Sequence, residues 1–384
     1  MIPYGRQSIS EADIEAVNKV LRSDYLTQGK IVPEFEQAVC NYTGARYGVA
    51  VNSGTSALHI ACLALGLKEG DYLWTTPITF VASSNCGRYC GAEVDFVDIN
   101  ENSWNIDVGR LKEKLLVAEK ENTLPKVLVV VHFAGLAADL EEIRELSNHY
   151  GFYVIEDACH ALGARYRDLA VGGCQYSEIT VFSFHPVKSI TSGEGGMALT
   201  NDRQLAETMR LLSCHGITRN PDKMNRHIDG AWYYEQIMLG YNYRMSDIHA
   251  ALGISQLKRL DEFVQHRSRI AETYHRELKR LPLQLPLIAG DHHSAYHLYT
   301  VVLTDGSALS RDELFSKMRE REIGVNVHYI PVHTQPYYRK SGHQSGTYPK
   351  AENYYQRALT LPCFPGLQYS EQKYVIDTLT ELLT

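Results

Sequence analysis

Residues 177–201 read SEITVFSFHPVKSITSGEGGMALTN. The stretch contains two apolar runs, Ile179–Phe184 and Met197–Thr200, which are typical of buried strands. A polar turn and the glycine-rich bend at 193–196 separate them. Lys188 lies in this connection between segments too apolar to be exposed, where loss of hydration lowers the pKa of an amine. Most lysines are solvated surface charges, but a partly desolvated amine is a candidate nucleophile for a Schiff base.

The composition is that of a globular protein. The chain has 384 residues, of which 44% are hydrophobic and 22% charged, and this length predicts two domains or one large domain with an appendage. A net charge of −7 does not favour nucleic acid or an anionic membrane as a partner. The eight cysteines are scattered without a C-x-x-C pair, and no segment has the pattern of a signal peptide or membrane helix. We therefore expect a cytoplasmic protein with reduced thiols and no membrane contact.

Strands and helices alternate over most of the first 250 residues. A capped helix follows Ser10, and a second one runs from Pro33 to Gly44. Near-continuously apolar strands that are each followed by a helix are typical of a mostly parallel sheet covered on both faces, which is an α/β fold. Besides the two runs beside Lys188, the expected strands are 49–51, 72–75, 94–97, 127–131 and 153–156, and the expected helices are 55–65, 80–89, 108–116, 140–149 and 203–212.

The remainder of the chain is organised differently. A polar and aromatic stretch at 216–235 predicts a loop or insertion, and a long helical pattern runs from Ser246 towards Leu281. We expect a large α/β domain at 1–250, with an N-terminal arm at 1–30, and a long connecting helix with a small α+β domain at 251–384. The small domain is predicted to contain strands at 297–303 and 325–329 and helices at 310–322, 351–359 and 371–383.

Residues suited to one ligand follow several of the expected strands. Because ligands bind beyond the carboxyl ends of parallel strands, these residues are expected to meet at one edge of the sheet. The turn 52–57 opens a helix whose N–H groups suit an anion, and Phe80 supplies a flat ring. Glu156 and Asp157 end a buried strand, where at least one of the two carboxylates is expected to meet a cation, and Asp157 is the candidate at this edge. With Ser183 and Lys188, these groups match the phosphate, the pyridine ring and the aldehyde of pyridoxal phosphate.

Longer motifs connect this chain to a known family. The sequence resembles the DegT/DnrJ family of pyridoxal-phosphate sugar aminotransferases along nearly its full length. The resemblance implies fold type I, with a mostly parallel seven-stranded sheet in a large domain and a small α+β C-terminal domain. The matching motifs are NSGTSAL (52–58), TTPITFVASSN (75–85), EDACHA (156–161), FSFHPVKSITSGEGG (182–196), LGYNYRMSDIHAALG (239–253) and VHYIPVH (327–333).

The resemblance also implies roles for individual residues. Lys188 would form the Schiff base with the cofactor and then move the proton, and Asp157 would pair with the pyridine nitrogen. Phe80 would stack on the ring, and His160, where many relatives have glutamine, would lie near the ring hydroxyl. Asn242 matches an asparagine that reaches the phosphate of the neighbouring subunit, which implies a homodimer with shared active sites. The phosphate would be held by Ser53, Gly54, Thr55 and Ser183, and the sugar-nucleotide pocket would be lined by Tyr4, Thr27, His185, His328 and Tyr329.

The motif at 327–333, with the residues that follow it, is most similar to family members of pseudaminic acid biosynthesis. These members aminate C4 of a UDP-linked 4-keto-6-deoxy-N-acetyl-altrose sugar, and we expect L-glutamate as the amino donor. Transaminases for other nucleotide-linked keto sugars, of the bacillosamine, viosamine or perosamine type, remain alternatives. A dehydratase that lacks the lysine and a non-catalytic regulator are disfavoured by Lys188, Asp157 and Ser183.

Other residue clusters have simpler interpretations. His292, His293 and His297 do not have the spacing of a standard zinc site, and we predict a polar interdomain loop and no metal. Cys86 and Cys90, four residues apart on an expected helix, are interpreted as packing residues. The aromatic clusters at 232–234 and 337–338 are predicted to serve an interface or the core. For the carboxylate of the amino donor, Arg6 and Arg244 are both candidates.

Overall fold

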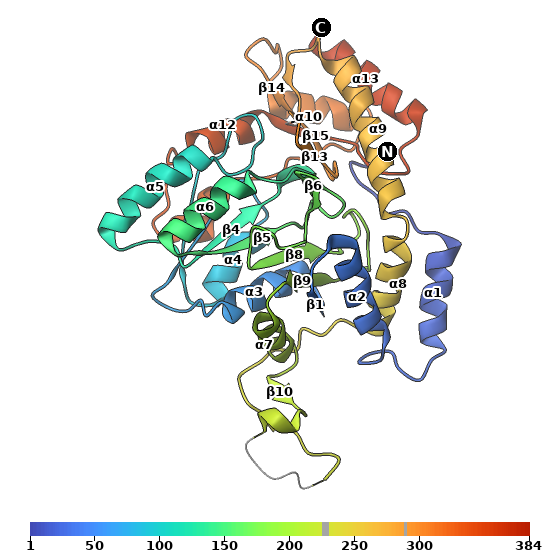
Figure 1. Ribbon diagram of the computed structural model, residues 1–384. Helices are drawn as coiled ribbons and strands as arrows, with labels where there is room; N and C mark the ends of the chain where they lie inside the picture. The colour runs from blue at the N-terminus through green and yellow to red at the C-terminus, as the bar shows by residue number, and fades with distance from the viewer. Residues whose placement is uncertain (225–229, 288–289) are drawn as a thin grey trace.

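The computed structural model describes residues 1–224, 230–287 and 290–384, and in these ranges a seven-stranded sheet has the strand order β1-β9-β8-β5-β4-β2-β3 (Figure 1). Neighbouring strands from β3 to β8 are parallel, whereas β9 is antiparallel to both β8 and β1. The predicted mostly parallel sheet is confirmed. Its strands are β1 (Tyr47–Val51), β2 (Tyr72–Thr75), β3 (Glu93–Phe96), β4 (Val127–Val131), β5 (Tyr153–Asp157), β8 (Ile179–Ser183) and β9 (Gly196–Thr200).

Helices cover both faces of this sheet. Successive strand residues point to opposite faces, and on β4 both sets are apolar. Leu128 packs in the same core cluster as Phe35, whereas Val129 packs in the cluster that contains Ile60. The first face is covered by α2 (Ile31–Thr43), α5 (Val108–Glu121) and α6 (Leu140–Tyr150), and the second by α3 (Gly54–Ala64), α4 (Ala82–Tyr89) and α7 (Arg203–Ser213).

The N-terminal helix α1 (Glu11–Leu21) packs on α8 (Asp247–Leu257), at the right of Figure 1. Ser10 caps α1, and the Asp13 carboxylate accepts a hydrogen bond from Arg259 at 2.6 Å. The single long helix expected from residue 246 is wrong, because α8 ends at Leu257 and α9 (Leu260–Leu278) begins after a break at Lys258. Both helices bury apolar residues, so the hydrophobic pattern continues across the break.

The C-terminal part of the chain forms a second sheet with its own core. In this core β14 pairs with both β12 and β15, and α9 and α13 pack against them. The division into domains at residue 250 stays a prediction. The elements are β12 (Leu283–Gln284), β14 (Tyr299–Leu303), β15 (Ala358–Leu361), α10 (Arg311–Glu320), α11 (Pro336–Lys340), α12 (Pro349–Arg357) and α13 (Tyr369–Leu383).

The strand predicted at 325–329 is wrong. Only Asn326 pairs with a strand residue, Thr360, in an isolated bridge, and the peptide bond between His328 and Tyr329 is cis. The carbonyl of His328 accepts a hydrogen bond from the Tyr354 hydroxyl at 2.8 Å and not from a neighbouring strand. The segment therefore leaves the sheet and turns towards the cavity described below.

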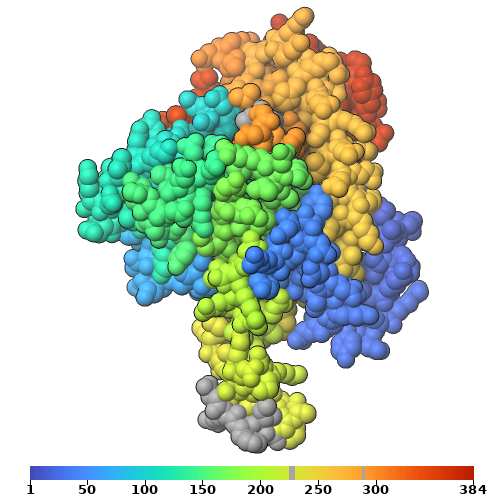
Figure 2. Space-filling view, in the orientation of Figure 1, coloured from blue at the N-terminus to red at the C-terminus, as the bar shows by residue number. Residues whose placement is uncertain are grey.

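Several short hairpins have little sequence signal. The residues predicted as a loop at 216–235 include β10 (Ile217–Thr218), which pairs with β11 (Glu235–Gln236), and residues 225–229 of that prediction lie outside the described residues. This hairpin projects from the body of the molecule (Figures 1 and 2). Elsewhere β6 (Arg165–Tyr166) pairs with β7 (Leu169–Ala170) and β13 (His292–His293), so the expected polar loop is partly a strand.

The cysteines are free thiols, and Cys86 is fully buried on α4. In the described ranges no helix combines the length and apolar character needed to cross a membrane. Within the same ranges no group of three or more histidine, cysteine, aspartate or glutamate side chains is arranged to hold a metal ion.

Candidate active site

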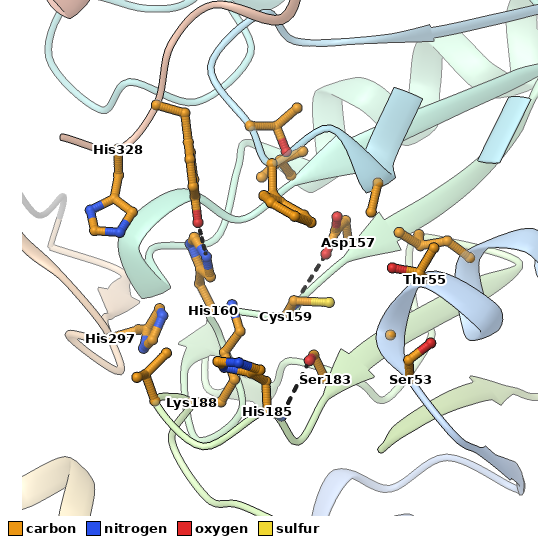
Figure 3. Close-up of a pocket in the computed structure, with 18 of the residues that line it drawn as sticks. Ser53, Thr55, Asp157, Cys159, His160, Ser183, His185, Lys188, His297 and His328 are labelled. Atoms are coloured by element: carbon orange, nitrogen blue, oxygen red, sulfur yellow. Dashed lines mark hydrogen bonds between the residues drawn. The ribbon is translucent and has the colours of Figure 1, made fainter. Parts of the chain in front are cut away.

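A cavity of about 460 Å³ lies beyond the carboxyl ends of β5 and β8 (Figure 3). It gathers most of the residues that the sequence predicted for the cofactor and the substrate. Cys159, Glu194, His297 and Asn326 also line it and were not predicted. The predicted residues that line it are Tyr4, Ser53, Gly54, Thr55, Phe80, Asp157, His160, Ser183, His185, Lys188, His328 and Tyr329.

Lys188 occupies the connection between β8 and β9, as the sequence predicted, and its side chain points into the cavity (Figure 3). Burial lowers the pKa of its amine, and the nearby Cys159 and Asp157 oppose that shift. No hydrogen-bond partner of its Nζ is found among the described residues. A desolvated amine without a partner is available as a nucleophile and as a proton carrier.

Asp157 lies at the end of β5 and is only 7% exposed. Its Oδ2 accepts a hydrogen bond from the Ser83 hydroxyl at 2.6 Å, and its Oδ1 accepts one from the Cys159 backbone N–H at 3.2 Å. The Thr79 hydroxyl lies 2.7 Å from that of Ser83. The carboxylate is therefore held in one orientation by neutral donors and is free to pair with a cation. Ser83 lies inside the TTPITFVASSN motif (75–85), but nothing in its spacing distinguishes it as the partner of Asp157.

The N-terminus of α3 has hydrogen-bond donors that suit an anion. The Ser53 side chain caps the helix by accepting the Ser56 N–H at 3.1 Å. In the described ranges, the backbone N–H groups of Gly54 and Thr55 have no acceptor. A Cβ added at Gly54 would lie 2.9 Å from the Cβ of Ser183, so this backbone approaches β8 as closely as glycine allows. The free donors and the helix dipole suit a phosphate.

Phe80 is an apolar side chain that the fold leaves 58% exposed. Its ring lines the cavity, 6.3 Å from the ring centroid of Tyr329. An exposed ring at a cavity wall offers its face to a flat ligand.

Three buried imidazoles surround the lysine. Burial and the nearby Lys188 lower the pKa of His160 and of His297 well below the usual value. For His328, whose Nδ1 lies 2.9 Å from the Thr360 hydroxyl, burial and Lys188 lower the pKa to about 3. All three rings are therefore neutral at pH 7. His297 was placed in a polar loop by its neighbours in the sequence, and only the fold brings it to the cavity.

Two predicted residues lie outside the cavity. Thr27 is exposed and forms an isolated bridge with Ser246, and Asn242 is exposed and forms one with Cys214. The role of Asn242 on a neighbouring subunit and that of Thr27 in the sugar pocket stay predictions. The candidate arginines for the donor carboxylate do not line the cavity either, since Arg244 contacts the Cys214 sulfur and Arg6 lies in a small recess behind Lys188.

The residues present fit pyridoxal phosphate. The free N–H groups at Gly54 and Thr55 suit its phosphate, and the exposed face of Phe80 suits its ring. Asp157 offers a fixed carboxylate to the ring nitrogen, and Lys188 offers an amine without a partner to the aldehyde.

A model of the DegT/DnrJ/EryC1/StrS aminotransferase family matches residues 7–380. The chain belongs to this family. The UDP-4-amino-4,6-dideoxy-N-acetyl-beta-L-altrosamine transaminase of Campylobacter jejuni subsp. jejuni serotype O:2 is 38% identical over 384 residues, which covers 100% of this chain and 98% of that relative. The predicted resemblance to the DegT/DnrJ family is confirmed.

Solved structures of sugar aminotransferases share the fold. Helicobacter pylori PseC, an aminotransferase involved in the biosynthesis of pseudoaminic acid, superimposes with a TM-score of 0.90 at 29% identity and covers 100% of this chain and 99% of its own. The PLP form of the putative sugar aminotransferase Spr1654 from Streptococcus pneumoniae gives a TM-score of 0.88 at 27% identity, with 100% of both chains covered. The predictions of fold type I, of a pyridoxal-phosphate-dependent sugar aminotransferase and of its cofactor are confirmed.

Proposed function

We propose that this enzyme transfers an amino group from L-glutamate to C4 of a UDP-linked 4-keto-6-deoxy-N-acetylhexosamine. The product is UDP-4-amino-4,6-dideoxy-N-acetyl-beta-L-altrosamine, an intermediate of pseudaminic acid biosynthesis. The observation that carries the proposal is the 38% identity to the Campylobacter transaminase over 100% of this chain and 98% of that relative. The structural likeness to PseC supports the same assignment.

Four residues of the cavity are suited to particular parts of this reaction. When bound, pyridoxal phosphate supplies an aldehyde that carries the amino group and a ring that withdraws electrons. Gly54 and Thr55 would hold the phosphate through their backbone N–H groups, and Asp157 would keep the ring nitrogen protonated. Lys188 would bind the aldehyde through its amine and, once released, would move a proton between Cα of the donor and C4′ of the cofactor. Burial lowers the pKa of the Lys188 amine. The free amine that takes a proton therefore forms more readily, and the protonated amine gives its proton up more readily.

The partner and the location of the enzyme are part of the proposal. We infer a homodimer in which Asn242 of one protomer completes the cavity of the other. The exposure of Asn242 supports this inference, as do Trp232 and Leu239, which lie in the segment beside it and are 73% and 78% exposed. Apolar side chains this exposed are typical of a surface that another chain covers. We also propose a cytoplasmic location for the enzyme, because the substrates proposed for it are nucleotide-linked sugars.

Product analysis with defined sugars tests the substrate. The purified enzyme is given L-glutamate and UDP-linked 4-keto-6-deoxy-N-acetylhexosamines that differ only in configuration at C5, and the products are identified by mass spectrometry and NMR. We expect the L-altro epimer to be aminated with the higher kcat/KM. Preference for the D-gluco epimer would defeat the pseudaminic assignment and favour a bacillosamine-type enzyme.

The chain also offers controls for this assay. Lys188→Ala should abolish amination of every sugar, whereas Lys258→Ala, which changes an exposed lysine at the end of α8, should leave it unchanged. Replacing L-glutamate with other amino acids identifies the donor, and a higher rate with another amino acid would correct that part of the proposal.

A further inference from the structure

His160 has both of its ring nitrogens engaged in hydrogen bonds. The backbone N–H of Ala134 approaches Nδ1 at 3.3 Å. The Tyr329 hydroxyl lies 3.0 Å from Nε2, and a dashed line marks this bond at His160 in Figure 3. A backbone N–H is only a donor, so Nδ1 is the acceptor in the first bond. The hydrogen of the neutral ring is then on Nε2, which donates to the Tyr329 oxygen.

The surroundings of His160 keep the ring neutral. It is 6% exposed, and a second proton on Nδ1 would face the N–H of Ala134. The other titratable groups that face it are His297, at 4.5 Å between ring centroids, His328 and Lys188. A cation at Lys188 disfavours a second one on His160, and the two other imidazoles are neutral. The direction of the bond to Tyr329 is therefore fixed.

This direction determines what the Tyr329 hydroxyl is able to do. Its oxygen accepts from His160, so its own hydrogen remains to be donated, and within the described residues it has no acceptor. Burial raises the pKa of Tyr329, and Asp157 adds to that effect, so the hydroxyl keeps its hydrogen throughout the working range. Tyr329 lines the cavity beside Phe80.

We propose that Tyr329 donates a hydrogen bond to an oxygen of the molecule bound in the cavity and that His160 is the positioning residue which orients this donor. Both nitrogens of His160 have protein partners in this arrangement, and its expected place near the ring hydroxyl of the cofactor stays a prediction. The acceptor is either the ring oxygen of pyridoxal phosphate or the carbonyl oxygen of the keto sugar. Only the second of these rests on the proposed function.

The test uses four variants of the full-length enzyme: Tyr329→Phe, His160→Gln, His160→Leu and the double variant Tyr329→Phe/His160→Leu. Glutamine accepts from Ala134 with its amide oxygen and donates to Tyr329 with its amide nitrogen, whereas leucine does neither. The first measurements are the Kd of the apoprotein for pyridoxal phosphate and the pH midpoint of the visible absorbance of the loaded enzyme, both without sugar. The second are kcat and KM for the keto sugar.

If the acceptor is the ring oxygen, Tyr329→Phe should weaken cofactor binding about tenfold and raise the pH midpoint, since the lost donor favoured the deprotonated oxygen. If the acceptor is the sugar carbonyl, kcat/KM should fall about tenfold with the cofactor Kd unchanged. In either case His160→Gln should resemble the wild type, and the double variant should be no worse than Tyr329→Phe alone.

The proposal is overturned if Tyr329→Phe leaves the cofactor Kd, the pH midpoint and kcat/KM within twofold of the wild type. It is also overturned if His160→Gln is as impaired as His160→Leu, or if the effects of the two single variants add in the double variant. If His160→Leu fails to fold, Tyr329→Phe and His160→Gln test the proposal on their own: the first should be impaired, and the second should resemble the wild type. Failure to aminate any sugar would refute the proposed substrate but leave the cofactor measurements interpretable.

Discussion

Replacing Gly54 with alanine places a methyl group at the phosphate-binding end of α3. The new Cβ would lie 2.9 Å from the Cβ of Ser183 and 3.3 Å from the Sγ of Cys159. An ordinary carbon–carbon contact is about 3.8 Å, so the helix end and β8 have to separate by up to about 0.9 Å. The backbone N–H groups of Gly54 and Thr55 move with the helix end, and we expect the variant to fold but to bind pyridoxal phosphate poorly.

The expected magnitudes follow from this overlap. Overpacking of this size costs about 1 to 3 kcal/mol. With an unfolding entropy of about 2.1 cal/mol/K per residue, a chain of 384 residues loses roughly 1 to 4 °C of Tm. Hydrogen bonds to a charged group contribute about 1.5 to 3 kcal/mol each, so losing the alignment of one donor should raise the cofactor Kd roughly 10- to 100-fold.

The assay is titration of apoprotein with pyridoxal phosphate, followed by absorbance, with Tm measured in parallel. Gly5→Ala is the matched control, since Gly5 also lies beside the cavity but its added Cβ meets only Val187, at an ordinary 3.8 Å. The control should match the wild type in both measurements. A folded Gly54→Ala variant whose cofactor Kd is within twofold of the wild type would refute the close approach at α3 as the basis of phosphate binding.

Other predictions concern the lysine, the carboxylate and a buried histidine. Lys188→Ala should lose the visible absorbance of the loaded enzyme and all turnover while Tm of the apoprotein changes little, and retained turnover would contradict its role. Ser83→Ala removes the hydroxyl that donates to Asp157 at 2.6 Å. The Kd for pyridoxal phosphate should then rise about tenfold, and an unchanged Kd would show that Ser83 does not orient the carboxylate for the cofactor. The pKa of His328 is about 3 in the folded enzyme, below its usual value near 6.5, so the unfolded chain binds the extra proton first and stability falls as pH drops below about 6.5. Between pH 6.5 and 5 this one group should lower the free energy of unfolding by about 1.6 kcal/mol. Thermal unfolding of His328→Asn should therefore depend less steeply on pH than that of the wild type, and equal pH slopes would contradict this prediction.

The parts of the site that were predictable are those fixed by local sequence. Lys188 lies in a short turn between two apolar strands, and Asp157 directly ends a buried strand, so the topology of a parallel sheet was enough to bring them to one edge. The turn that opens α3 is also local, because the small residues before the helix leave its first N–H groups free.

The parts that were missed depend on contacts between distant segments. Ser83 reaches Asp157 across 74 residues, and nothing in the helix that carries it marks this face. His297 lies in a polar neighbourhood of the sequence but is 4% exposed in the fold. The segment at 325–329 alternates like a strand, yet a side chain, that of Tyr354, takes the carbonyl that a strand would pair. A local sequence pattern indicates which secondary structure a segment prefers. The positions of these residues depend instead on tertiary packing between distant segments, which such a pattern does not contain.

Strand β9 is the last strand of the large sheet to be synthesised, yet it lies between β1 and β8. A nascent chain that has left the ribosome as far as Lys188 already contains the phosphate-binding turn, the carboxylate and the lysine. It lacks the strand that joins β1, and with it Ser53, to the rest of the sheet. Gly196, the first residue of β9, lies so close to Ser53 that an added Cβ would be 2.3 Å from its carbonyl oxygen. We therefore expect the chain to bind pyridoxal phosphate only after β9 has joined the sheet, so that cofactor binding would report a complete sheet.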